Sequence, residues 1–234
     1  MSTGDVNYLL IVTVLAMLIG IIKGYRKGFL RLAVYIAGLI LVVLIVTKIS
    51  PYVSDFLIDR TTLYDEVREK IVRIYEEKNQ AKDNSQIENQ KATIESYGLP
   101  DVIAGALTSN NNQDMYKKLA AVLFEEYISG YLAKIVIKAG SYFILFVILA
   151  IAMFCVLAAI KIIEKIPVLK TFNRLLGVIA GGGMVVVFVW VFFIGIMMFF
   201  YDSLGTWMLN QVKSSVFLSF LFNNNYLFKM ILNV

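Results

Sequence analysis

The residues best placed for a chemical role form a basic, glycine-rich stretch, GIIKGYRKGFLR, at residues 20–31. Three glycines, Gly20, Gly24 and Gly28, lie four residues apart, so on a helix they share one face. Small residues at this spacing let two helices approach closely in lipid. Four cations and no acid lie among the glycines, namely Lys23, Arg26, Lys27 and Arg31. The predicted chemistry is therefore helix packing and contact with anionic lipid, without making or breaking bonds.

The composition excludes the commonest catalytic and metal-binding groups. The 234 residues include no histidine and one cysteine, Cys155, which lies in an apolar run. A histidine-based triad, a Cys/His zinc site and an intrachain disulfide are therefore excluded. The sequence also has neither a GxxxxGK[ST] nucleotide loop nor an HExxH motif. We expect no enzymatic activity, no cofactor and no metal ion.

The elements that must position the glycines and cations are membrane-spanning helices. Hydrophobic residues make up 59% of the chain and charged residues 17%, whereas soluble domains contain about 25% charged residues. A spanning helix needs about 20 apolar residues. The sequence predicts an all-α integral membrane bundle of four transmembrane helices. Their expected spans are residues 6–24, 29–48, 138–161 and 174–201.

These spans divide the chain into four predicted regions. A first transmembrane hairpin precedes a helical extracytoplasmic insert between the second and third spans. A second hairpin then precedes an extracytoplasmic or interfacial tail. The regions are residues 1–50, 51–134, 135–201 and 202–234.

The insert contains two predicted amphipathic helices separated by a polar stretch. Leu63, Val67 and Ile71 mark the apolar face of the first helix. Residues 79–96 suggest a solvated helix or a linker. Asp114 is a candidate N-cap of the second helix, which could continue into the third span past a weak point at Ser129–Gly130. The insert could form a small domain on the outer membrane face, lie on the lipid surface or bind another protein.

Charge placement predicts which side of the membrane each connection faces. Residues 23–31 carry four cations and no acid, and residues 161–174 carry four cations and one acid. Short connections rich in Lys and Arg remain in the cytoplasm. Residues 49–138 carry more acids than cations. We therefore predict a multi-pass protein of the bacterial cytoplasmic (inner) membrane, with both termini and the insert outside.

The fourth span repeats the glycine spacing of the first. Gly177 and Gly181 again lie four residues apart at its start. The favoured interpretation is a tight bundle in which these glycines are contact points. An alternative is that glycine-lined helices slide or open a pore. The predicted helix-packing residues are Gly20, Gly24, Gly28, Gly177 and Gly181.

Five polar residues are predicted to make contacts at the cytoplasmic interface. They are Arg26, Lys27, Arg31, Asn173 and Arg174. One interpretation is that such residues anchor the spans and meet anionic lipid. The other is that Asn173 and Arg174 cap the fourth helix and bind the opposite turn. Asn173 could be the N-cap of a helix starting at Arg174, with Pro167 ending the preceding segment.

Two stretches resemble the colicin V production protein (CvpA) family. KGYRKGFLRLAVYIAGLIL is similar to that family's first cytoplasmic turn and second span, and IPVLKTFNRLLGVIAGG to its second turn and fourth span. The positions that carry the pattern are Gly28, Phe29 and Arg31, then Pro167, Asn173, Arg174, Gly177 and Gly181. The resemblance implies an integral inner-membrane protein linked to toxin production or export, with an accessory or transport role.

These observations predict a CvpA-like accessory to production or export of a toxin- or bacteriocin-type product. A subunit of a small oligomeric channel or transporter is the first alternative. A cell-envelope binding module centred on residues 51–134 is the second. The uncharged parts of the spans offer no residues for a proton relay, which disfavours an ion-coupled pump. The lipid bilayer is the expected partner, a second copy and other envelope or export proteins are candidates, and no nucleic acid is expected.

Overall fold

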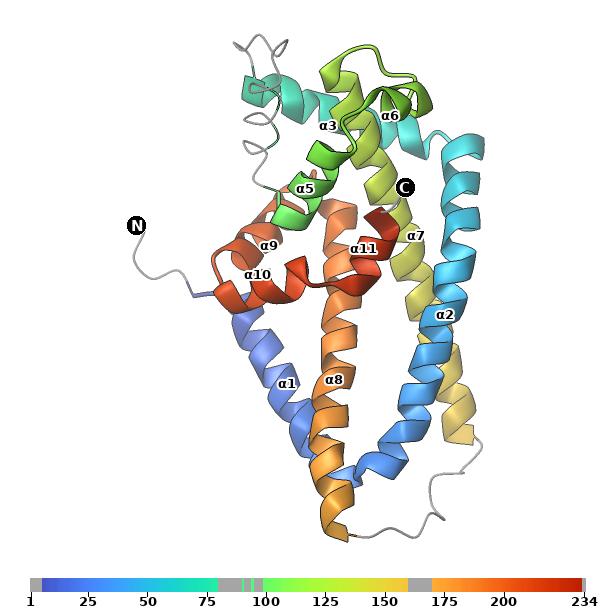
Figure 1. The fold of residues 1–234 in the computed structure, drawn as a ribbon, viewed down its shortest axis with the longest axis vertical. Coiled ribbons are helices and arrows are strands. Elements are labelled where there is room, and N and C mark those ends of the chain that lie inside the picture. The colour runs from blue at the N-terminus through green and yellow to red at the C-terminus, as the bar shows by residue number, and fades with distance from the viewer. Residues whose placement is uncertain (1–5, 80–89, 91–93, 95–98, 160–169, 233–234) are drawn as a thin grey trace.

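The structure, a computed structural model, describes residues 6–79, 90, 94, 99–159 and 170–232. Within these residues the fold is helical, without strands (Figure 1). Four helices are long and apolar enough to cross a membrane. They are α1 (Tyr8–Lys27), α2 (Phe29–Arg60), α7 (Phe124–Ala159) and α8 (Lys170–Ile196). The all-α prediction and the four apolar helices of spanning length are confirmed.

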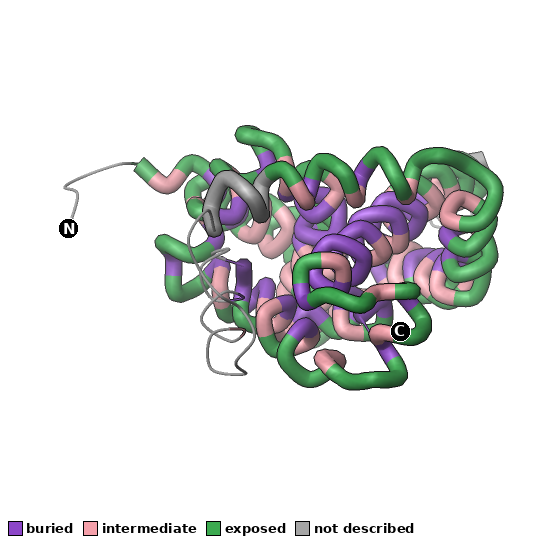
Figure 2. Tube along the Cα trace, turned by 90° about the horizontal axis from the view of Figure 1, so that it is seen from above, coloured by how far each residue is buried: buried purple, intermediate pink, exposed green. Residues whose placement is uncertain are grey.

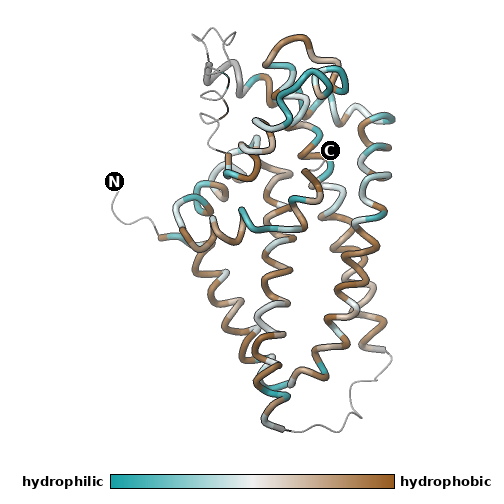
Figure 3. Tube along the Cα trace, viewed as in Figure 1, coloured by the Kyte–Doolittle hydropathy of each residue, from teal (hydrophilic) through white to brown (hydrophobic). Residues whose placement is uncertain are grey.

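The long helices bring the ends of both short connections to one end of the molecule. The end of α1, the start of α2, the end of α7 and the start of α8 all lie at the end drawn lowest in Figure 1. The shorter helices lie toward the other end. Apolar residues dominate the long helices between these ends (Figure 3). Only 17% of the most apolar stretch of α1 is buried within the chain, so most of its surface is available to lipid.

A single glycine joins the first two helices. Gly28 has φ +77°, in a region that residues with a side chain rarely adopt. Its N–H donates to the carbonyl oxygen of Gly24 at 2.8 Å and closes α1, and α2 begins at the next residue. At its other end, α1 is capped by Asn7, whose side chain accepts from the N–H of Leu10 at 2.8 Å.

Two of the long helices extend well beyond the thickness of a membrane. With a rise of about 1.5 Å per residue, the 32 residues of α2 measure about 48 Å and the 36 residues of α7 about 54 Å. A hydrocarbon core is only about 30 Å thick. Both helices continue without a break across residues 51 and 134, where the sequence predicted the edges of the insert.

The insert starts with α3 (Leu63–Asn79), whose Val67 and Ile71 are buried in the core, as the apolar pattern predicts. Leu63, predicted on the same face, is exposed at the first residue of the helix. Gly130 on α7 faces this helix, because a Cβ there would lie 2.9 Å from the hydroxyl oxygen of Tyr64. The predicted weak point at Ser129–Gly130 is wrong, since α7 runs straight through it. Most of the polar stretch 79–96 lies outside the described residues.

The second predicted helix of the insert is shorter than expected. Helix α6 spans Gln113–Lys118, and its N-cap is Asn112, whose side chain accepts from the N–H of Met115 at 3.1 Å. The predicted N-cap, Asp114, lies inside the first turn. After α6 the backbone turns at Ala120, which has φ +49°. The helix therefore ends before α7 begins and does not continue into it.

The C-terminal region folds back onto the bundle. A short 3-10 helix, Met197–Phe199, follows α8, and three helices then pack beside α5 (Asp101–Ser109) and the long helices. They are α9 (Ser203–Lys213), α10 (Val216–Asn223) and α11 (Tyr226–Leu232). The amide of Asn225 donates to the carbonyl oxygen of Trp190 at 2.9 Å, and the indole of Trp190 donates to that of Leu221 at 3.1 Å. The region predicted as a tail thus contributes to the core.

Burial is densest around the first half of α7. Residues 127–142 of this helix are almost all buried, whereas its later residues are mostly exposed or half-buried. Seen from above, buried residues lie in the middle of the molecule and exposed ones around the outside (Figure 2). The chain therefore has a packed core toward the end that holds the insert and the C-terminal helices, and more open helices at the other end.

Candidate functional site

The predicted packing glycines meet where α1 crosses α8. A Cβ added to Gly24 would clash with the carbonyl oxygen of Gly177, and one added to Gly177 would clash with that of Gly24. Gly181 faces the carbonyl oxygen of Gly20 in the same way. The two backbones touch directly, because any side chain at these positions would separate them. Close approach of this kind is how helices gain packing energy in lipid, where burial from water does not drive them together.

Asn173 fastens the same crossing to the start of α2. Its side-chain oxygen accepts from the N–H of Leu30 at 2.9 Å. This N–H is one of the first four in α2, which lack partners within the helix. Gly28, the residue before α2, has no side chain to cap it. Asn173 therefore caps α2 from a helix much later in the chain.

The predicted role of Asn173 as the N-cap of its own helix is wrong. Helix α8 already includes Lys170, so Asn173 lies within the helix. Its side chain is free to reach α2, and it also lies against Gly28, where an added Cβ would clash with the amide nitrogen. Pro167, predicted to end the preceding segment, lies outside the described residues.

The predicted cations surround this crossing. The guanidinium of Arg174 lies over the ring of Tyr25 at 5.6 Å, and the ammonium of Lys27 lies over the ring of Tyr35 at the same distance. Such contacts with an aromatic face hold a cationic side chain while its charge stays accessible. The structure thus brings Asn173 and Arg174 next to the first connection. Arg26 and Arg31 are exposed there.

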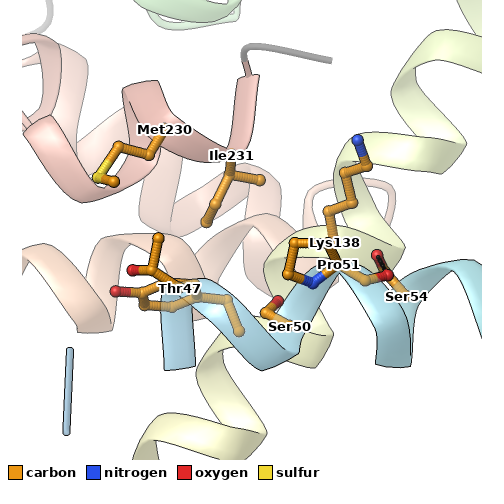
Figure 4. A pocket seen from close by; sticks show the side chains of 8 residues that line it. Thr47, Ser50, Pro51, Ser54, Lys138, Met230 and Ile231 are labelled. Carbon is orange, nitrogen blue, oxygen red and sulfur yellow. Dashed lines mark hydrogen bonds between the residues drawn. The ribbon is translucent and has the colours of Figure 1, made fainter. Parts of the chain in front are cut away.

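A polar pocket between α2 and α7 was not predicted. It has a volume of about 180 Å³ and lies beneath α11, whose Met230 and Ile231 lie over the residues of α2 (Figure 4). Its polar lining combines hydroxyl groups from both helices with one ammonium. The polar residues are Thr47, Ser50 and Ser54 on α2, and Lys138 and Tyr142 on α7.

The pocket gathers hydrogen-bonding groups that the helices themselves leave unpaired. Pro51 has no N–H, so the carbonyl oxygen of Thr47 lacks its usual helical donor. The hydroxyl of Tyr142 is buried beside Thr47 without forming a hydrogen bond of ordinary geometry. Ser54 instead donates to the carbonyl oxygen of Pro51 at 2.9 Å. The space is large enough for water molecules, which would satisfy these groups.

A sequence signal for this pocket existed. A proline inside an apolar helical run leaves one backbone carbonyl without its N–H donor. Hydroxyl residues nearby could donate a hydrogen bond to this carbonyl, or could bind the same water molecules as it does. Thr47, Ser50, Pro51 and Ser54 form this pattern. Because the predicted second span ends at residue 48, Thr47 falls inside the span and the other three residues outside it, so the pattern was not recognised.

Comparison of the chain with protein-family models, curated proteins and solved structures found no match. The resemblance to the CvpA family rests on the two turn-and-span stretches alone.

Proposed function

We propose that the chain is a CvpA-like protein of the bacterial inner membrane, accessory to production or export of a toxin- or bacteriocin-type product. One observation carries the proposal. The two family-like stretches, far apart in the sequence, meet at one crossing, where Gly28 lies against Asn173 and Gly24 against Gly177. A pattern shared with a family is best explained when its residues have a common structural task. Here that task is to hold α1, α2 and α8 together.

The same contact favours an accessory role over transport. The α1–α8 crossing is closed by backbone against backbone, which leaves no path between these two helices at that level. The surfaces that remain for a partner are the exposed cations at one end and the insert with the C-terminal helices at the other. In the proposed orientation the cations face the cytoplasm, as the charge bias favours, and the insert faces the outside.

The channel alternative is favoured by one different observation, the polar pocket. Hydroxyl groups and a freed carbonyl line the pocket between α2 and α7, and the Lys138 side chain also lines it, with its ammonium pointing away from Thr47 and Ser50 (Figure 4). Polar groups inside a membrane bundle commonly mark a pathway for an ion or a substrate. The pocket lies at only one end of the bundle, however, so a path across the membrane would need a second copy or a change in packing.

Crosslinking in native membranes, followed by purification of the tagged chain, tests the proposal. We expect identified export components or the precursor of the secreted product to copurify above the level found with an unrelated four-span membrane protein. The pure protein in liposomes should give no reproducible conductance or solute flux. Conductance from the pure protein without such partners would replace the accessory role with the channel alternative.

A further inference from the structure

A groove between α1 and α2 has the shape and charge of a binding site. Its volume is about 490 Å³, and side chains from α7 and α8 form its floor. Ile19, Phe154 and Phe188 are among its apolar walls, and Lys23, Lys27 and Tyr35 also line it. The groove is thus apolar along most of its length, with two ammonium groups near the connection between α1 and α2.

The groove follows from the glycine crossing. Helix α1 packs chiefly on α8 and touches α2 far less, because Gly28 turns α2 away from α1 immediately after the crossing. The space between α1 and α2 is therefore not filled by either helix. Gly20 and Gly181, which contact each other at the crossing, also line the groove. A cavity of this kind within the membrane region would be covered by lipid.

The charges of the lining determine which lipid fits. Lys23 and Lys27 lie one turn apart on the same face of α1, and no acid lines the groove. The ammonium of Lys27 lies 5.6 Å from the centre of the Tyr35 ring, so its side chain is held at this end of the groove. Two cations at the end of a spanning helix lie at the level of the headgroups. The complementary occupant has an anionic head and an apolar chain.

We propose that this groove binds one anionic phospholipid, with an acyl chain along Ile19, Phe154 and Phe188 and the phosphate beside Lys23 and Lys27. The site is independent of the proposed accessory role, because it requires only that the chain lies in a membrane. It makes Lys23 and Lys27 specific binding residues, whereas Arg26, on the same turn, contributes only to the general surface charge.

Lipid binding to the purified full chain in detergent tests the site, using phosphatidylglycerol and phosphatidylcholine with identical acyl chains. Bound lipid is counted by native mass spectrometry across a titration. The wild type should bind one phosphatidylglycerol more tightly than phosphatidylcholine. Removing each lysine charge should weaken phosphatidylglycerol binding about fivefold, the effect of one cation near an anionic headgroup. Water-soluble glycerol phosphate should not compete, because it has no acyl chain.

Matched variants separate this site from diffuse charge. Lys23→Gln with Lys27→Gln should abolish the preference, while Arg26→Gln should retain it and Lys23→Arg with Lys27→Arg should largely retain it. Ile19→Trp should narrow the groove and weaken the binding of both lipids. Equal binding of the two lipids by the wild type would overturn the proposal. So would an equal loss in Arg26→Gln, or displacement of the lipid by glycerol phosphate. Each variant's thermal midpoint without lipid identifies any that fails to fold. If the double glutamine variant does not fold, Lys23→Gln and Lys27→Gln made singly still test the charge.

Discussion

At the scale of single residues, Gly28 and Asn173 depend on each other. Gly28 must be glycine because its φ is +77° and because the Asn173 amide lies where its Cβ would be. Gly28 is the N-cap of α2 but has no side chain to accept from its first N–H groups. Asn173 supplies the missing acceptor by binding the N–H of Leu30. The turn between α1 and α2 is therefore stable only when α8 lies beside it.

Replacing Asn173 with alanine should destabilise the protein by about 1 kcal/mol, because the N–H of Leu30 then loses its cap. In a chain of this size that corresponds to a fall of roughly 2–4 °C in the thermal midpoint. Thr171→Ala is the control, since Thr171 is exposed on the same turn of α8. Thermal unfolding in detergent measures both. Equal midpoints for the two variants would show that the hydrogen bond to Leu30 contributes nothing.

At the scale of the elements, α1 and α8 are held together by the close fit of their glycines, whereas the interface of α2 with α7 includes a break in the backbone hydrogen bonds of α2. The glycine crossing tolerates no added atom on either helix. Pro51, by contrast, interrupts the backbone hydrogen bonds of α2 beside α7. The α1–α8 interface depends on the absence of side chains. The α2–α7 interface contains polar groups that Pro51 leaves without their usual partners.

Adding one methyl group should distinguish glycines at the crossing from glycines elsewhere on α8. Gly177→Ala or Gly24→Ala should destabilise the chain by about 1–3 kcal/mol, because the helices must move apart. Gly183→Ala is the matched control, since nothing lies within 4 Å of its added Cβ. It should be neutral or stabilise by up to about 1 kcal/mol through helix propensity. Thermal unfolding compares them, and a Gly177→Ala variant as stable as Gly183→Ala would contradict the close crossing.

Restoring the backbone donor at residue 51 should stabilise α2. Pro51→Ala provides an N–H for the carbonyl oxygen of Thr47, and proline within a helix costs up to about 3 kcal/mol relative to alanine. We expect a higher thermal midpoint, with a gain of about 1 kcal/mol or more. Pro100→Ala is the control, because Pro100 precedes α5 and breaks no helix. An unchanged or lower midpoint for Pro51→Ala would mean that the surrounding packing requires the proline.

At the scale of the whole molecule, the sequence predicts the spanning helices well and their surroundings poorly. Long apolar runs and glycines spaced four residues apart are local patterns, so the spanning helices and their packing glycines can be predicted from the sequence itself. The partner of Asn173 lies 143 residues away, and no local pattern indicates it. Helices α2 and α7 extend past the predicted spans, because charged residues such as Asp55 and Glu126 continue a helix outside the membrane as readily as they end a span. The folding of residues 202–232 onto α5, α7 and α8 depends on the assembled core.

The arrangement of the whole chain leads to a prediction about orientation. The exposed cations lie at one end and the insert at the other, so the charge bias favours the basic end in the cytoplasm. Val122, two residues before α7, is 84% exposed at the insert end, and Thr171 is exposed at the basic end. Single cysteines at these positions, in a Cys155→Ser background, would be treated with a membrane-impermeant thiol reagent. Intact cells should label residue 122 and not residue 171, and permeabilised cells should label both. The opposite pattern would reverse the orientation, and labelling of both in intact cells would rule out a bundle that separates its two ends across a membrane.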